Sequence, residues 1–330
     1  MVSVRKVVAA AVVAWLWVAA AQPASAQATV DPKLPAYKAI AGVSGSVKSV
    51  GSDTMNNLMT LWAEGFNKYY PNVRVEIEGK GSATGPPALI EGTATFAPMS
   101  REMKAEEIDG FERKYGYKPT LVPTSIDMLA VYVHKDNPLK SLTLPQVDAA
   151  FSKTRKLGFK EDITQWGQLG LQGEWENSPI SLYGRNSASG TYAYFKERAL
   201  GKGDFKDSVK EQPGSSAVVQ AIGADKFGIG YSGIGYKTAD VRTIHVSAKL
   251  GGKPVPADPK FAFSGEYPLA RPLLLYVNFK PNTRLDPLRA EFLRYVLSKP
   301  GQQAVIKDGY IPLTAAAADR YLKQLGLASK

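Results

Sequence analysis

The sequence predicts an α/β fold, because one unit of strand, polar loop and helix occurs three times along the chain. Residues 47–50, 73–77 and 180–183 are short apolar or alternating runs that are typical of strands. Each run is followed by a loop rich in Ser, Thr and Gly, and each loop by a segment of helical character. In α/β proteins such loops lie beyond the carboxyl ends of parallel strands, where ligands bind.

The helix of each unit has its own signal. After the first loop, apolar residues recur at helical spacing up to about Pro71; they are Leu58, Leu61, Trp62, Phe66 and Tyr69. After the second loop, two prolines stand where a first helical turn tolerates them. Residues 192–200 have helical character and are expected to form the third helix.

Further elements extend the alternation of strands and helices. Residues 128–134 and 273–279 are expected to be strands, and residues 144–151 a short helix with proline near its start. Residues 286–298 carry apolar side chains on one helical face and end at a Lys-Pro-Gly sequence, which predicts a strong final helix.

The N-terminus has the pattern of a secretory signal peptide over residues 1–26. Arg5 and Lys6 precede an apolar stretch of 15 residues, and Ala24-Ser25-Ala26 forms a small-residue cleavage site. This stretch is shorter than the roughly 20 residues that span a membrane. We expect cleavage near Ala26 and a periplasmic location, with secretion beyond the periplasm as an alternative. Residues 27–45, rich in Pro and Gly with little periodicity, are expected to be a flexible leader.

Composition narrows the possible functions. The chain has no Cys, which excludes disulfides and thiolate metal sites. Without Arg5 and Lys6 it would carry 39 basic and 30 acidic residues, a net charge of +9 that suits either an anionic ligand or solubility. Nucleic acid is not an expected partner, because no three Lys or Arg residues are consecutive and no basic tract interleaves with aromatics.

The three loops together predict a site for a tetrahedral anion. They are residues 51–54 (GSDT), 81–85 (GSATG) and 185–191 (RNSASGT). Backbone N–H groups at a helix N-terminus, the helix dipole and small hydroxyl donors all favour an anion, and Arg185 adds a charged fork. Any one of these loops alone would be explained by ordinary helix capping.

The sequence gives little support for a catalytic function. His134 and His245 lie in apolar strand-like runs, where a structural role is expected. The chain has no zinc motif, nucleophile elbow or Walker loop, and no cofactor is expected. Residues 228–233 match a dinucleotide fingerprint formally, but neither the following helix nor the distant acidic residue is present, so tight packing is the better explanation.

The order of these motifs resembles PstS-type phosphate-binding proteins from about Val47 to Leu313. The resemblance rests on the three loops together with residues 99–101 (MSR), 227–231 (FGIGY) and 267–273 (YPLARPL). It implies a type II periplasmic binding protein that closes on inorganic phosphate and delivers it to the membrane permease of an ABC importer. Each lobe would be a mixed sheet flanked by helices, with lobe 1 formed by residues 46–125 and 265–330 and lobe 2 by residues 126–264. A monomer is expected.

The resemblance also implies a ligand set. The implied phosphate-binding residues are Ser52, Asp53, Thr54, Ser82, Ser100, Arg185, Ser189, Gly190 and Thr191. Ser100 stands where the best-known members carry an aspartate that accepts the phosphate proton and rejects sulfate. Asp53 either replaces that acceptor or caps its own helix. Arg101 either reaches the anion or pins its loop by an ion pair, and Arg271 is expected to have a structural role near the chain crossing.

Two other functions stay open from the sequence. Because Ser100 replaces a carboxylate, the anion could instead be sulfate, molybdate or tungstate. A secreted phosphatase or phosphate-scavenging adhesin on the same scaffold would need a nucleophile with a base, and neither Ser82 nor Thr54 has a base that the sequence suggests.

Overall fold

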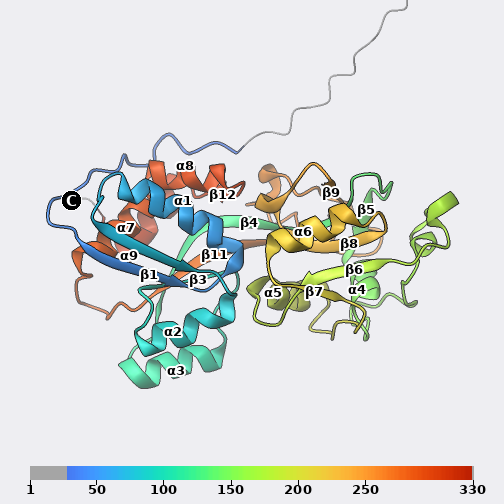
Figure 1. The fold of residues 1–330 in the computed structure, drawn as a ribbon, viewed down its shortest axis with the longest axis horizontal. Coiled ribbons are helices and arrows are strands. Elements are labelled where there is room, and N and C mark those ends of the chain that lie inside the picture. Colours follow the sequence, from blue (N-terminus) through green and yellow to red (C-terminus); the bar gives the residue numbers. More distant parts are fainter. Residues whose placement is uncertain (1–27, 329–330) are drawn as a thin grey trace, which may run out of the picture.

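The computed structural model describes residues 28–328, and the predicted signal peptide lies outside these residues. The chain forms a mixed α/β structure, as the strand and helix signals predict, and this structure has two halves (Figure 1). Its main sheet has ten strands in the order β2-β1-β3-β11-β4-β8-β6-β7, with β12 and β9 also paired to β4. No helix within the described chain is both long and apolar enough to cross a bilayer.

The first half is built from the N-terminal and C-terminal parts of the described chain. Its strands are β1 (Gly45–Val50), β2 (Val73–Glu78), β3 (Phe96–Met99), β11 (Ala270–Val277) and β12 (Ile311–Pro312). Strands β1, β2 and β3 are parallel, and β11 is antiparallel to β3. Its helices are α1 (Asn56–Asn67), α2 (Gly85–Glu91), α3 (Ala105–Tyr115), α7 (Pro287–Val296), α8 (Lys299–Lys307) and α9 (Ala315–Gln324), with short 3-10 turns η1 (Asp53–Met55) and η2 (Ser82–Thr84).

The second half is built from the middle of the chain. Its strands are β5 (Ser141–Thr143), β6 (Ser181–Arg185), β7 (Lys210–Gln212), β8 (Gly228–Gly233), β9 (Val241–Thr243) and β10 (His245–Ser247). Its helices are α4 (Leu144–Phe151), α5 (Gly190–Ala199) and α6 (Ser215–Ala224). Short 3-10 turns complete it: η3 (Trp166–Leu169), η4 (Gly173–Trp175), η5 (Ile234–Tyr236) and η6 (Pro259–Phe261).

Strand β4 (Thr120–His134) joins the halves (Figure 1). Its first residues pair with β11 and β12, and residues from Leu129 onwards pair with β8 and β9. The sequence predicted only residues 128–134, because Thr124, Ser125 and Asp127 interrupt the apolar pattern. All three of these polar side chains are nevertheless buried.

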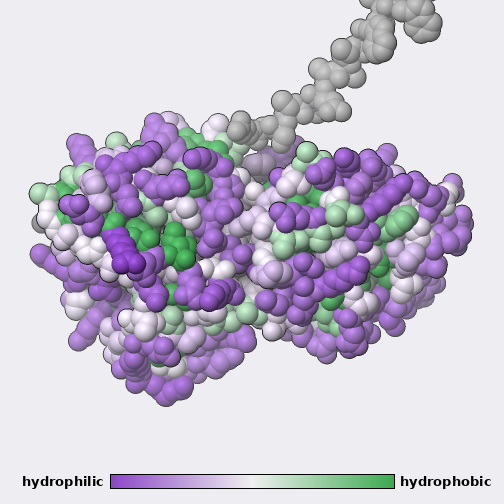
Figure 2. Space-filling model, in the orientation of Figure 1, coloured by the Kyte–Doolittle hydropathy of each residue, from purple (hydrophilic) through white to green (hydrophobic). Residues whose placement is uncertain are grey.

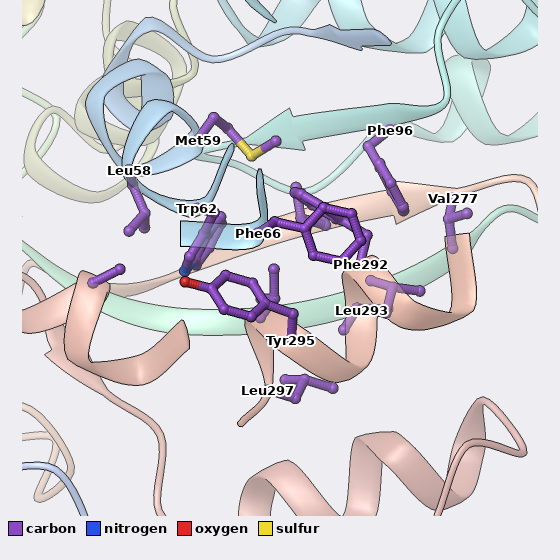
Figure 3. Packing of buried hydrophobic residues seen from close by; sticks show 14 of the residues in the cluster. Leu58, Met59, Trp62, Phe66, Phe96, Val277, Phe292, Leu293, Tyr295 and Leu297 are labelled. Atoms are coloured by element: carbon purple, nitrogen blue, oxygen red, sulfur yellow. The ribbon is translucent and has the colours of Figure 1, made fainter. Parts of the chain in front are cut away.

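Each half has its own hydrophobic core. In the first half, Leu58, Met59, Trp62 and Phe66 of α1 share one hydrophobic cluster with residues of α7, and the Phe66 and Phe292 ring centroids lie 5.3 Å apart (Figure 3). The Trp62 indole N–H also donates to the Gly301 carbonyl at 2.8 Å. In the second half a separate cluster surrounds Phe151, Trp166, Phe195 and Tyr231. The face seen in Figure 2 is mostly hydrophilic over both halves, as expected when the apolar side chains lie in two internal cores.

The predicted leader packs on the first half along much of its length. Leu34 is buried in the α1–α7 core, and the Pro35 carbonyl accepts a hydrogen bond from Lys299 N at the start of α8. The Asp31 carboxylate accepts from Ala315 N at the start of α9. Strand β1 already begins at Gly45, so the prediction of an unstructured segment up to residue 45 extended one residue too far.

The glycine-rich run at residues 228–233 is the buried strand β8, and it is followed by the short turn η5 rather than by an α-helix. A Cβ at Gly230 would lie 2.6 Å from the Tyr183 carbonyl oxygen on the neighbouring strand. Close strand packing therefore explains these glycines, as the sequence analysis expected.

Candidate functional site

The three polar loops lie at strand ends and lead into helices. Residues 51–54 follow β1 and enter η1 and α1, and residues 81–85 follow β2 and enter η2 and α2. In the third loop, Arg185 ends β6 and Ser189 caps α5, because the Ser189 Oγ accepts from the backbone N–H groups of Thr191 and Tyr192. The strand–loop–helix pattern thus places all three loops at a comparable position in the fold.

The predicted hydroxyl side chains are all buried. The exposed fraction is 2% or less for each of Ser52, Thr54, Ser82, Ser100, Ser189 and Thr191. Hydroxyl groups removed from water need hydrogen-bond partners, and here many of the partners are other hydroxyls. The Ser52 and Ser100 Oγ atoms lie 3.0 Å apart, and the Ser82 and Ser100 Oγ atoms 3.3 Å apart.

Direct contacts join loops of the two halves. Thr54 Oγ1 lies 2.8 Å from Thr191 Oγ1, and Ala83 N donates to the Ala188 carbonyl at 3.1 Å. A Cβ placed on Gly190 would lie 2.3 Å from Ser82 Oγ. Only a glycine hydrogen fits there, so the start of α5 is pressed against the second loop and the structure brings all three loops together.

Arg185 supplies a buried cation to this cluster, with 1% of its surface exposed. Its Nη1 donates to Ser215 Oγ at 2.7 Å and lies 3.1 Å from an Asp53 carboxylate oxygen, and its Nη2 donates to the Pro213 carbonyl. Its buried Nε has no hydrogen-bond partner among residues 28–328. Burial lowers the pKa of the guanidinium below its usual value, and the Asp53 carboxylate acts in the opposite direction. The guanidinium therefore keeps a free donor.

Asp53 does not cap its own helix, so that alternative was wrong. Residue Ser52 precedes η1, and neither η1 nor α1 has a side-chain cap. The Asp53 Oδ2 instead accepts from Ser215 N at 2.8 Å, at the start of α6 in the second half. The carboxylate is drawn across the interface because both Arg185 and this helix N-terminus attract a negative charge.

Arg101 makes an ion pair, which decides between its two predicted roles. Its two terminal nitrogens donate to the two Glu107 carboxylate oxygens at 2.8 and 2.7 Å. This bidentate pair ties the β3–α3 loop to α3, so Arg101 pins its own loop.

Arg271 is more closely involved than the sequence indicated. Its Nε and Nη2 donate to Asp127 Oδ2, in an ion pair whose side chains are both almost fully buried. The same guanidinium donates to the Ser100 carbonyl at 2.8 Å and to Thr191 Oγ1 at 2.9 Å. Arg271 therefore fixes site residues of both halves, in addition to lying near the chain crossing.

Sequence reasoning missed Ser215 and two tyrosines that contact the first loop. The Tyr236 hydroxyl donates to the carbonyls of Asp53 and Thr54, and the Tyr310 hydroxyl donates to that of Thr54. Ser215 carried a signal, because it follows Pro-Gly just before a helix-like run. The tyrosines carried none. Among residues 28–328, no group of three His, Asp or Glu side chains is placed to hold a metal ion.

Comparison with known proteins agrees with this arrangement. The family model described as "PBP superfamily domain" matches residues 23–300. A protein of Pseudomonas aeruginosa named "Phosphate-binding protein PstS" is 58% identical over 92% of this chain and 94% of its own length. The chain belongs to the PstS family. A second family member, from Staphylococcus epidermidis, is 28% identical over 85% of this chain and 82% of its own.

Solved structures of the family have the same fold. One from Clostridium perfringens, described as a phosphate ABC transporter substrate-binding protein with bound phosphate, superimposes with a TM-score of 0.69 at 27% identity, over 82% of this chain and 100% of the other. A phosphate transport receptor from Vibrio cholerae gives a TM-score of 0.62 at 23% identity, over 81% of this chain and 100% of the other. The predicted type II periplasmic binding protein fold is therefore confirmed.

Proposed function

We propose that this chain binds inorganic phosphate between two lobes and delivers it to the membrane permease of an ABC importer. Its membership of the PstS family supports this proposal. The observation that carries it is the convergence of buried hydroxyl groups from the three predicted loops and from Ser100, beside the buried guanidinium groups of Arg185 and Arg271. Such a set of donors matches the oxygens of a tetrahedral anion.

Each part of the proposed ligand set has a distinct role. Gly190 is proposed to donate its backbone N–H, Arg185 to supply the positive charge, and Asp53 to accept the anion's proton. The remaining members are proposed to donate their hydroxyl groups; they are Ser52, Thr54, Ser82, Ser100, Ser189 and Thr191. The hydroxyls now bond mainly to one another, and turning them toward an anion exchanges weak neutral bonds for stronger charge-assisted ones. The unpartnered Arg185 Nε is a further donor that an anion could use.

We propose the lobe boundaries given by the resemblance, with lobe 1 over residues 46–125 and 265–330 and lobe 2 over residues 126–264. Separate hydrophobic clusters in the two halves and a sheet joined through β4 support this division. Phosphate would bind while the lobes are apart and would then be dehydrated as they close. Closure is stabilised because the closed state makes contacts with the anion that the open state lacks.

Selectivity for phosphate over sulfate needs an acceptor for the proton that phosphate carries. Ser100 offers a hydroxyl at the position of the family aspartate, whereas Asp53 Oδ1 is free of the bonds that occupy Oδ2. A bare carboxylate 4 Å from a like charge would be repelled by about 4 kcal/mol at an effective dielectric of about 20, and a shared proton removes this repulsion. We therefore expect Asp53→Asn to reduce the preference for phosphate over sulfate in calorimetric titrations. An unchanged preference would remove Asp53 from the ligand set.

Binding rather than catalysis is the role that the hydroxyl contacts favour. The hydrogen bonds of Ser82 Oγ and Thr54 Oγ1 in the described chain go to other hydroxyls and to a backbone N–H. A serine or threonine nucleophile needs a base within hydrogen-bond reach. Purified protein should therefore show no turnover of a phosphomonoester, and a robust rate would favour the secreted phosphatase.

The cellular context follows from the family. We propose that residues 1–26 are removed after export, that the mature protein acts as a monomer in the periplasm, and that the permease is its partner. Mass spectrometry of the exported protein would give the cleavage site, and light scattering would give the oligomeric state.

The function is tested by titrating protein freed of bound anion with phosphate, sulfate, arsenate and molybdate at two pH values. We expect saturable binding of phosphate and weaker binding of the others. Preferential binding of sulfate, molybdate or tungstate would instead assign the chain to another oxyanion.

A further inference from the structure

Helix α6 in the second half begins without a cap of its own. Its N-cap residue is Gly214, which has no side chain, and no cap bond comes from a neighbour in sequence. The first N–H groups of a helix have no partner within the helix and need an outside acceptor. That acceptor is Asp53 of the first half, whose Oδ2 lies 2.8 Å from Ser215 N. A Cβ at Gly214 would lie 3.0 Å from Asp53 Oδ1, so glycine leaves room for this carboxylate.

The same carboxylate balances a buried charge. Asp53 Oδ2 lies 3.1 Å from Arg185 Nη1, and this nitrogen also donates to Ser215 Oγ at 2.7 Å. The Ser215 backbone N–H, which donates to the same Asp53 oxygen, closes a triangle of three residues in which only Asp53 comes from the first half. A buried cation without a partner is strongly destabilising. Separation of the halves would take the Asp53 carboxylate away from Arg185 and leave its charge unbalanced unless water took the place of the carboxylate.

The backbone of the first loop is also held from the second half. The Tyr236 hydroxyl, in η5 after β8, donates to the Asp53 carbonyl at 3.0 Å and to the Thr54 carbonyl at 3.2 Å. Tyr310, which follows α8 in the first half, donates to the same Thr54 carbonyl at 2.8 Å. Tyr236 follows β8 in the second half, and its ring packs against hydrophobic clusters of both halves. The Thr54 carbonyl therefore accepts hydrogen bonds from one tyrosine of each half.

We propose that Asp53 is a positioning residue that latches the two halves together by capping α6 and compensating Arg185. The latch stabilises the closed arrangement before an anion enters and slows release once it is bound. The identity of the anion in this inference rests on the proposed function. The contacts of Asp53 with Ser215 and Arg185 are present in the structure without any anion. Asp53 Oδ2 makes the latch, so the role differs from acceptance of a proton by Oδ1.

The test compares Asp53→Ala with a matched control, Asp286→Ala. Asp286 also caps a helix, since its carboxylate accepts from Arg289 N at 3.0 Å, and it also pairs with that arginine. Its cap lies within the first half, so its loss should lower stability without affecting closure. Because the chain has no Cys, spin labels can be placed on exposed residues of each half by Glu112→Cys and Asn177→Cys.

Two measurements test whether Asp53 holds the two halves together. Electron paramagnetic resonance on phosphate-free protein should show a shift to longer label distances in Asp53→Ala but not in Asp286→Ala. Stopped-flow measurement should show phosphate release about tenfold faster in Asp53→Ala, which corresponds to about 1.4 kcal/mol, a size within the range for loss of a cap. Equal distances and equal release rates in the two variants would overturn the proposal.

Other results are also decisive. A changed preference for phosphate over sulfate with unchanged label distances would assign Asp53 to the anion's proton and reject the latch. If the wild-type protein binds no phosphate, the proposed function fails while the distance measurement still tests the latch. If Asp53→Ala does not fold, Tyr236→Phe and Tyr310→Phe replace it, and only the first should lengthen the distances.

Discussion

Replacing Arg185 with alanine tests the proposed anion cage through the cation of its third loop. The side chain is 1% exposed and its Nε has no partner within the described part of the chain, so this N–H is available to bond an anion. A hydrogen bond to a charged group contributes about 1.5–3 kcal/mol. The variant should therefore bind phosphate about 10- to 150-fold more weakly for one such bond, and more weakly still for two.

The assay is isothermal titration calorimetry on protein freed of bound anion, with circular dichroism to confirm that the variant is folded. Arg284→Ala is the control, because Arg284 is exposed and its loss changes the net charge equally. The control should bind phosphate as the wild type does. An Arg185→Ala protein that is folded and retains wild-type affinity would refute the assignment of the cage.

Three further predictions follow from packing and burial. Gly190→Ala should abolish measurable phosphate binding, because the added Cβ would lie 2.3 Å from Ser82 Oγ; wild-type affinity would show that the loops need not meet. Trp62→Ala should lower the free energy of unfolding by about 3–5 kcal/mol in urea denaturation, since the indole fills the α1–α7 core; a loss below 1 kcal/mol would contradict this packing. Burial raises the pKa of Asp308 to about 7, so the folded protein binds more protons than the unfolded chain between about pH 4 and 7, and this group makes stability fall as pH rises through that window. Asp308→Asn should flatten the fall, and an unchanged pH profile of the melting temperature would reject the assignment.

Local signals were sufficient to predict the fold class and the loops. Strand, loop and helix residues lie next to one another in sequence, so periodicity and capping chemistry locate them. The full length of β4 was not predictable in this way. Its buried Thr124 and Asp127 are compatible with a strand because partners elsewhere in the fold, the Leu273 carbonyl and Arg271, accept from or donate to their side chains.

The sequence predicted which loops form the site, but it did not predict the hydrogen bonds and ion pairs that their residues make. Asp53 and Ser215 are 162 residues apart, and nothing local to either residue indicates that one caps the helix of the other. The roles of Tyr236 and Tyr310 depend in the same way on where the chain returns to the first loop. Such contacts require the relative position of the two halves, which single-sequence patterns do not contain.

A calorimetric titration of the wild-type protein with phosphate and sulfate tests the central claim most directly. The protein must first be unfolded and refolded to remove bound anion. The account predicts a single saturable site for phosphate, with sulfate binding much more weakly. No heat of binding with phosphate, together with saturable binding of sulfate, would contradict it.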